Sequence, residues 1–263
     1  MALAALVAIT LLCTAWSLWI RRLTWTCRWE VAATLNIALQ GAAILLMSPW
    51  ASETIGHGLH TITGKWNIED FIGHDCYIVA ASAIVYNAIG RLKKDHAMQR
   101  FFRLHIELPA TLCIPVLLAA FSLGNGARIY RADFFDVPTD AWLKIYWLLL
   151  GGMLIYLLSY GCRALLLLRQ DPRSRRIANF YLAAAASGII ACSIKVISAF
   201  ITPIQAAEGG NLVWFFACTC GIGFALASAH SWRNKLKWFS LAPRPARNSS
   251  GDDSQVTDPA VDR

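Results

Sequence analysis

Seven long apolar stretches, separated by short polar segments, occupy most of the chain. Each approaches the ~20 residues that a helix needs to cross about 30 Å of hydrocarbon. Backbone groups in lipid must be satisfied within their own segment, so the stretches are predicted to be α-helices; the ~10-residue alternating strands of an outer-membrane barrel are not seen. The predicted spans are residues 2–20, 31–49, 68–89, 106–123, 142–167, 177–201 and 212–230.

Prolines and glycines mark special points in this pattern. Pro109 and Pro115 interrupt the fourth stretch. A kink is expected there, because proline removes a backbone donor. Gly151 and Gly152 lie in the fifth stretch, and Gly221 and Gly223 lie in the seventh. Small residues at such positions are expected to let neighbouring helices approach closely.

The two ends of the chain differ in character. No basic residue precedes the first stretch, whereas Arg21 and Arg22 follow it. This order is the reverse of a secretory signal peptide, so the stretch is predicted to be an uncleaved span. Residues 241–263 are rich in polar residues and Pro, without apolar periodicity. We therefore expect a transmembrane domain over residues 1–240, followed by a disordered cytoplasmic tail.

Lys and Arg residues gather on one side of the predicted membrane. Over alternate connections, 18 lie on one side and four, Lys65, Arg128, Arg131 and Lys144, lie on the other. The positive-inside rule makes the side with 18 cytoplasmic. The N-terminus is then outside and the C-terminus in the cytoplasm, and the pattern predicts an all-α bundle of seven transmembrane helices.

Composition agrees with a membrane protein. Hydrophobic residues make up 57% of the chain and charged residues only 15%, against about 25% charged in soluble domains. The net charge of +8 is interpreted as a topology signal and as contact with anionic lipid heads, not as a nucleic-acid footprint. The eight cysteines include no CxxC pair, and most are expected to be small packing residues.

The start of the third stretch carries the most informative polar residues. Asn67 is expected to cap this helix, with Asp70 at the third position of a capping box. His74 lies one turn beyond Asp70, so the two side chains are able to meet. Asp75 follows inside the apolar stretch. An embedded carboxylate costs up to about 2.5–3.5 kcal/mol at the bilayer centre, and such residues usually face the bundle interior and pair.

Lys195 is the basic residue placed well inside an apolar stretch, near its outer end. Two interpretations stay open for it. The ammonium could simply snorkel to the outer surface, or the third and sixth spans could approach each other there. The second interpretation predicts an outward-facing polar cluster of Asp70, His74, Asp75 and Lys195.

No enzymatic machinery is recognised in the sequence. A metal site built from His57, His60, His74 and Asp75 was weighed, but no HExxH pattern is present and capping explains the segment better. No nucleophile–base pair and no glycine-rich nucleotide motif is evident. The chain is therefore expected not to be an enzyme and to need no cofactor or metal.

Residues 63–92, reading TGKWNIEDFIGHDCYIVAASAIVYNAIGRL, also resemble a known group of sequences. The segment is similar to polytopic membrane proteins of mycobacteria and other actinobacteria, and of mycobacteriophages and their prophages. The matching features are Asn67, then Gly73 and His74 at the top of an apolar helix. This resemblance implies a multi-pass membrane protein without an assigned reaction. It also implies a role of the kind that some phage-borne membrane proteins have, in defence or superinfection exclusion.

Three classes of function follow from these observations. The first is a protein of the cytoplasmic membrane that acts by binding partners in the bilayer, including phage exclusion. The second is a small-solute transporter or channel, and the third is a membrane sensor. A transporter would show charged or broken helices meeting at mid-membrane, whereas Asp75 and Lys195 are expected near the outer edge; this argues against transport.

The predicted topology can be tested with reporter fusions. Fusions at Lys94 and Arg173 are expected to report a cytoplasmic position, and fusions at Gly126 and Gly209 an external one, because of the uneven charge distribution. A cytoplasmic signal from Gly126 would contradict the seven-span topology.

Overall fold

The computed structural model describes residues 2–27, 30–90, 96–172, 174–201 and 209–241. Within these ranges the chain is helical and contains no β-strand, which confirms the all-α prediction. The expected disordered tail lies almost wholly outside the described residues. The long helices are α1 (Ala2–Ile20), α2 (Val31–Leu46), α5 (Ile68–Gly90), α7 (Leu108–Leu123), α8 (Ala141–Leu168), α9 (Arg175–Phe200) and α11 (Gly209–Leu241).

Among the residues that the structure describes, six helices are long and apolar enough to cross a membrane. A seventh span is obtained if the pair Val31–Leu46 and Pro49–Thr63, which is bent by 62°, is counted as one. The protein is therefore a multi-pass membrane protein by the length and composition of its helices. Which side each end of the chain faces stays a prediction from the charge distribution.

The second predicted span is shorter than expected and continues as a bent segment. After α2 the chain turns at Ser48, whose hydroxyl accepts a hydrogen bond from the Ala51 N–H, and Pro49 starts a new helical turn. We call residues 49–63 the bent segment. It comprises α3 (Pro49–Ala51), a π-helical turn η2 (Ser52–Gly56) and α4 (His57–Thr63).

The fourth predicted span starts earlier than expected. A short helix α6 (His96–Phe102) and a π-helical turn η3 (Arg103–Glu107) lead directly into α7, and residues 99–123 count as one span. The kink expected from the prolines stays a prediction, because residues 99–123 count as one span; what the structure shows is this π-helical turn. It lies just before Pro109, whose ring removes a helical donor, while Pro115 lies inside α7.

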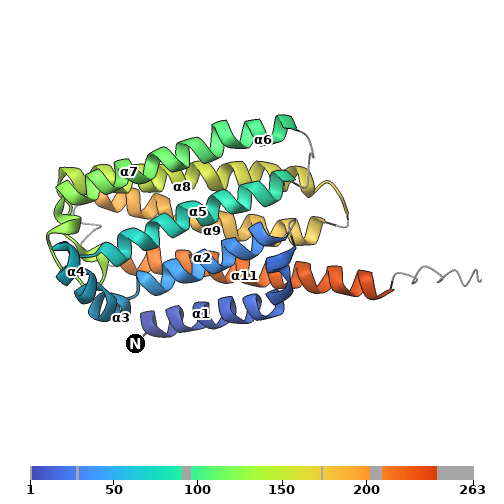
Figure 1. Cartoon of the computed structure of the whole chain (residues 1–263), viewed down its shortest axis with the longest axis horizontal. Helices are drawn as coiled ribbons and strands as arrows, with labels where there is room; N and C mark the ends of the chain where they lie inside the picture. Colours follow the sequence, from blue (N-terminus) through green and yellow to red (C-terminus); the bar gives the residue numbers. More distant parts are fainter. Residues whose placement is uncertain (1, 28–29, 91–95, 173, 202–208, 242–263) are drawn as a thin grey trace, which may run out of the picture.

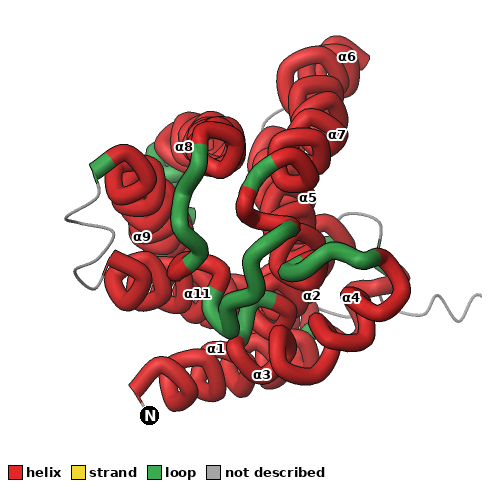
Figure 2. The backbone as a smooth tube through the Cα atoms, turned by 90° about the vertical axis from the view of Figure 1, so that its left-hand side faces the viewer, coloured by secondary structure: helices red, strands yellow, loops and turns green. Residues whose placement is uncertain are grey.

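The helices run side by side along the long axis of the molecule (Figure 1). The neighbouring pairs α1–α2, α2–α5, α5–α8, α8–α9, α9–α11 and α11–α1 form a closed ring. Viewed along the helices, α7 lies at the edge of this ring, where it packs on α5 and α8 (Figure 2). The interior of the ring is thus enclosed on all sides by helices.

Close approach between helices is seen at Gly151, Gly221 and Gly223, whereas Gly152 has no neighbour within 4 Å and the expectation for it is wrong. A Cβ added at Gly151 would lie 2.4 Å from Val196 Cγ2 on α9, and one added at Gly223 would lie 2.7 Å from Ala184 Cβ. At either position a larger side chain would force the neighbouring atoms to move. These two glycines therefore set the spacing of α8 and α11 against α9.

A buried ionic network joins three helices at the end of the bundle predicted to be cytoplasmic. Arg21, only 1% exposed, donates hydrogen bonds to Glu30 Oε2 at 2.9 Å, Thr34 Oγ1 at 3.1 Å and the Ser228 carbonyl at 3.2 Å. Glu30 also pairs with Lys235 of α11. Burial acts to raise the pKa of Glu30, but the hydrogen bonds and charges of Lys235 and Arg21 outweigh it and lower that pKa. The network thus ties α1, α2 and α11 together.

We expect this network to control stability. Replacing one partner of a buried ion pair leaves the other charge uncompensated, which costs about 3–5 kcal/mol. Arg21→Gln and Glu30→Gln should each lower the melting temperature of the purified protein in detergent strongly. Arg22→Gln, at the exposed neighbouring arginine, is the matched control and should change it little. Equal losses for Arg21→Gln and Arg22→Gln would contradict a structural role for the network.

Candidate functional site

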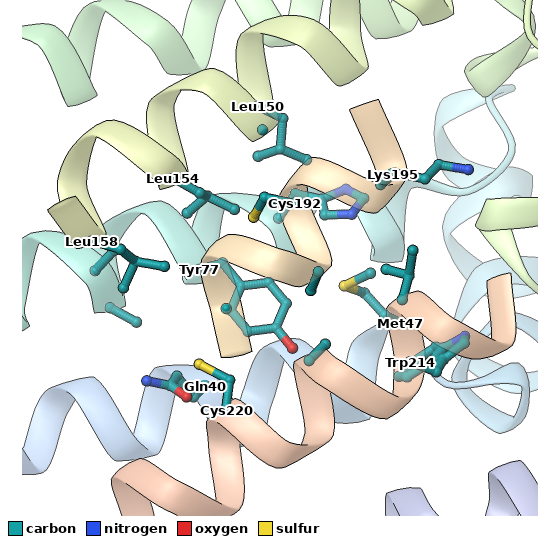
Figure 3. A pocket seen from close by; sticks show the side chains of 18 of the residues that line it. Gln40, Met47, Tyr77, Leu150, Leu154, Leu158, Cys192, Lys195, Trp214 and Cys220 are labelled. Carbon is teal, nitrogen blue, oxygen red and sulfur yellow. The ribbon is translucent and has the colours of Figure 1, made fainter. Parts of the chain in front are cut away.

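A cavity of about 90 Å³ lies inside the ring of helices, between α2, α5, α8, α9 and α11. Figure 3 shows side chains from these helices pointing into it. Its walls are mostly apolar, with Leu150, Leu154 and Leu158 from one face of α8 and Phe224 from α11. The polar residues that line it are His74, Lys195, Tyr77, Gln40 and two cysteines, Cys192 and Cys220.

Lys195 is buried at this cavity and does not snorkel outward. It is 6% exposed, and its Nζ donates to the Phe135 carbonyl at 3.0 Å. The ammonium also lies over the ring of Trp147, 4.4 Å from the centroid, and over that of Phe135. Within the described ranges no carboxylate forms an ion pair with it. The buried ammonium therefore lies at the edge of the cavity and is directed toward the connection between α7 and α8 (Figure 3). There it has one carbonyl acceptor, two aromatic rings and the electrostatic influence of Asp133 and Asp136.

His74 lies at the same end of the cavity as Lys195, in contact with Tyr146 and Trp147. His74, 3% exposed, shares a hydrogen bond between its Nδ1 and the Tyr146 hydroxyl at 2.8 Å. It contacts Trp147 edge to face, and the Trp147 indole N–H is buried without an acceptor in the protein. The expected contact between His74 and Asp70 is not formed, since Tyr146 occupies the imidazole. Lys195 and Trp147 thus leave donor capacity unused at this end.

The connection between α7 and α8 closes the cavity beside Lys195. Asp133 accepts hydrogen bonds from Trp214 Nε1 at 2.8 Å and from the Phe135 N–H at 2.9 Å, which anchors the connection on α11. Burial raises the pKa of Asp133, and the charge of Asp136 adds to this, although the two hydrogen bonds and Lys195 act against it. The anchored turn places the Phe135 carbonyl within reach of the ammonium.

The capping box expected at the start of α5 is wrong. Asn67 adopts a left-handed conformation (φ 56°), and its Nδ2 donates to the carbonyls of Gly126 at 2.7 Å and Ile129 at 2.9 Å. Its amide thus holds the α7–α8 connection instead of capping the helix. Glu69 and Asp70 are 1% and 0% exposed, and none of their four carboxylate oxygens has a hydrogen-bond partner in the protein.

The helix N-terminus at the start of α5 does not offset the free-energy cost of burying the Glu69 and Asp70 carboxylates. A helix N-terminus stabilises a nearby carboxylate by about 0.3–1 kcal/mol, and by up to ~2 kcal/mol when partly buried. Removing an ion from water costs several kcal/mol for each charge. Glu69 and Asp70 also repel each other. The pair is therefore a second place where buried charge lacks a partner.

Asp75 does not join Lys195. It is half-buried, one of its carboxylate oxygens has no partner, and its electrostatic neighbours are Cys113 of α7 and Tyr146 of α8. Of the predicted polar cluster, the structure brings His74 and Lys195 to one cavity, while neither Asp70 nor Asp75 lines it. The unpartnered Trp147 donor and the buried Glu69 were not among the predicted site residues, because their burial depends on the packing of other helices.

Neither a metal-binding group nor a similar protein indicates the function of this site. Within the part of the chain that the structure describes, no group of three or more His, Cys, Asp or Glu side chains could hold a metal ion. Comparison of the chain with protein-family models, with curated proteins and with solved structures finds no match. The argument for function therefore rests on the geometry of the cavity and of the buried charges.

The separation of Asp75 from Lys195 can be measured with a double-mutant cycle. Since the two side chains form no ion pair, the effects of Asp75→Asn and Lys195→Met on the free energy of unfolding should add within about 0.5 kcal/mol. A larger coupling energy would show that the two charges meet, as the outward-facing cluster requires.

Proposed function

We propose that the protein is a transporter for a small organic anion, which binds in the central cavity. The observation that carries this proposal is the Lys195 ammonium, buried at the cavity with no carboxylate paired to it. An uncompensated buried charge is costly, and ionisable residues within membrane helices commonly mark a substrate path. A bound anion would supply the missing charge.

The shape of the cavity narrows the chemistry of this anion. Donors lie at the end formed by Lys195 and Trp147, whereas the leucines of α8 form an apolar wall. A volume of about 90 Å³ leaves room for a ligand of only a few carbon atoms. These features fit a short-chain carboxylate, with its acidic group at Lys195 and its few carbons against the leucines.

Irregular helices support transport over simple binding. Two π-helical turns, η2 and η3, interrupt the helical runs at the bent segment and before α7. A 62° bend separates α2 from the bent segment. Discontinuous helices around a central site are typical of secondary transporters, and π-helical turns occur often at functional positions. The sequence-based argument against transport placed Lys195 at the outer edge, whereas its side chain lies inside the bundle.

The other interpretations make different predictions for the same cavity. A sensor would bind the anion without moving it, and flux measurements distinguish the two. Partner binding in phage exclusion, implied by the resemblance of residues 63–92, stays a prediction that does not need the cavity. We place the protein in the cytoplasmic membrane with the Lys195 end of the cavity toward the outside, following the charge distribution. The proposed function involves no catalysis.

Anion binding can be tested by thermal stability in detergent. A ligand that binds only the folded state raises the melting temperature in a saturable way. Butyrate, compared with chloride at equal ionic strength, should raise it for the wild type and for the control Lys144→Gln. Lys195→Gln should abolish the shift, because it removes the charge that holds the carboxylate. Uptake of labelled butyrate into proteoliposomes should follow the same order.

Two outcomes would contradict the proposal. The first is the absence of any shift across acetate, butyrate and hexanoate in the wild type. The second is an unchanged shift in Lys195→Gln. Binding without uptake would favour the sensor instead of the transporter.

A further inference from the structure

A cluster of buried oxygen atoms lies apart from the central cavity, where the bent segment covers the start of α5. Ser52, Glu69 and Asp70 are each at most 1% exposed, and their side-chain oxygens have no hydrogen-bond partner in the protein. Ser52 belongs to the π-helical turn η2, while the two acids belong to the first turn of α5. None of the three lines the central cavity.

The fold brings these residues together by close packing. Figure 1 shows the bent segment at the same end of the bundle as the start of α5, and η2 packs against α5. The Glu69 carboxylate lies against Gly56, where an added Cβ would be 2.6 Å from Oε1. Ser52 lies beside both acids and interacts with each of them. The site thus lies between η2 and the first turn of α5, which α4 separates along the chain.

The charges around this cluster of oxygen atoms make it strongly negative. Glu69 and Asp70 act on each other, and Asp133 adds a third negative charge near Asp70. The basic side chain that acts electrostatically on Glu69 is that of His57. Within the described ranges no Lys or Arg forms an ion pair with either acid. The helix N-terminus offsets only part of this burial, so positive charge must come from elsewhere.

We infer that Glu69, Asp70 and Ser52 bind a metal cation that prefers oxygen ligands. Carboxylates and a hydroxyl are ligands of this type, and no nitrogen or sulfur donor is required. Ser52 provides an observation independent of the acids: its fully buried hydroxyl lies close enough to act on both carboxylates, yet it forms no hydrogen bond of normal geometry. The charge of two carboxylates favours a divalent ion such as Ca²⁺. This inference goes beyond the anion transport proposed above and does not depend on it.

The cation site can be tested on the full-length protein in detergent without any organic anion. The melting temperature would be measured in choline chloride, with CaCl₂ or NaCl added at constant ionic strength. Binding to the folded state should raise it in a saturable way for the wild type and for the control Glu53→Gln, an exposed acid of the same bent segment. A response to CaCl₂ alone identifies a divalent site, and a response to NaCl alone a monovalent one.

Variants of the two acids and of Ser52 are expected to lose or weaken this response to cations. The double variant Glu69→Gln, Asp70→Asn should show no cation response. In choline chloride it should melt at a higher temperature than the wild type, because it no longer buries two uncompensated charges. Ser52→Ala should keep the response but require at least about tenfold more cation for half of the shift.

Two results would overturn the inference. One is a wild-type melting temperature that is the same in choline, sodium and calcium but rises as the pH is lowered, since protons then neutralise the acids. The other is an equal cation response in the wild type and the double variant. Either result leaves the butyrate experiment unaffected, so failure of the cation site and failure of the proposed transport can be told apart.

Discussion

Compensation of buried charge is the constraint on which this bundle depends. In an apolar interior a charged side chain is costly unless a partner and enough hydrogen bonds replace the water that it loses. Arg21 meets this requirement fully. Its guanidinium bonds the Glu30 carboxylate, a hydroxyl of α2 and a carbonyl of α11, and Lys235 neutralises the second oxygen of Glu30. The first, second and last long helices are thereby held at one end of the ring.

The opposite half of the bundle lacks this compensation. Lys195 carries an unpaired positive charge at the cavity, while Glu69 and Asp70 carry unpaired negative charges under the bent segment. These groups do not neutralise one another. Asp133 lies in the connection between α7 and α8, where Trp214 donates a hydrogen bond to it. It interacts electrostatically with both Lys195 and Asp70. One protein thus holds two separate sites of opposite charge, which suits the binding of an anion and a cation.

The candidate site was predicted only in part. His74 and Lys195 could be selected from the sequence because polar residues stand out in apolar stretches. Their partners could not be predicted. Asp70 was assigned to a cap on the basis of spacing, but Asn67 uses its amide for a tertiary contact and leaves the cap unmade. One of the two open interpretations brought Asp75 to Lys195, yet its electrostatic neighbours include Cys113 of α7 and Tyr146 of α8. Successive helical residues differ by about 100° in direction, so small differences in helix rotation decide which charges meet.

The sequence by itself determined the class of protein and the position of its apolar helices. Hydrophobic length is a local property, and a helix in lipid satisfies its own backbone, so neither conclusion needs tertiary contacts. Only the tertiary structure decided that the chain bends by 62° after α2, that five of the helices surround a cavity, and that Lys195 is buried at its edge. These features depend on how neighbouring helices pack and rotate against each other, and residues distant in the sequence supply that information.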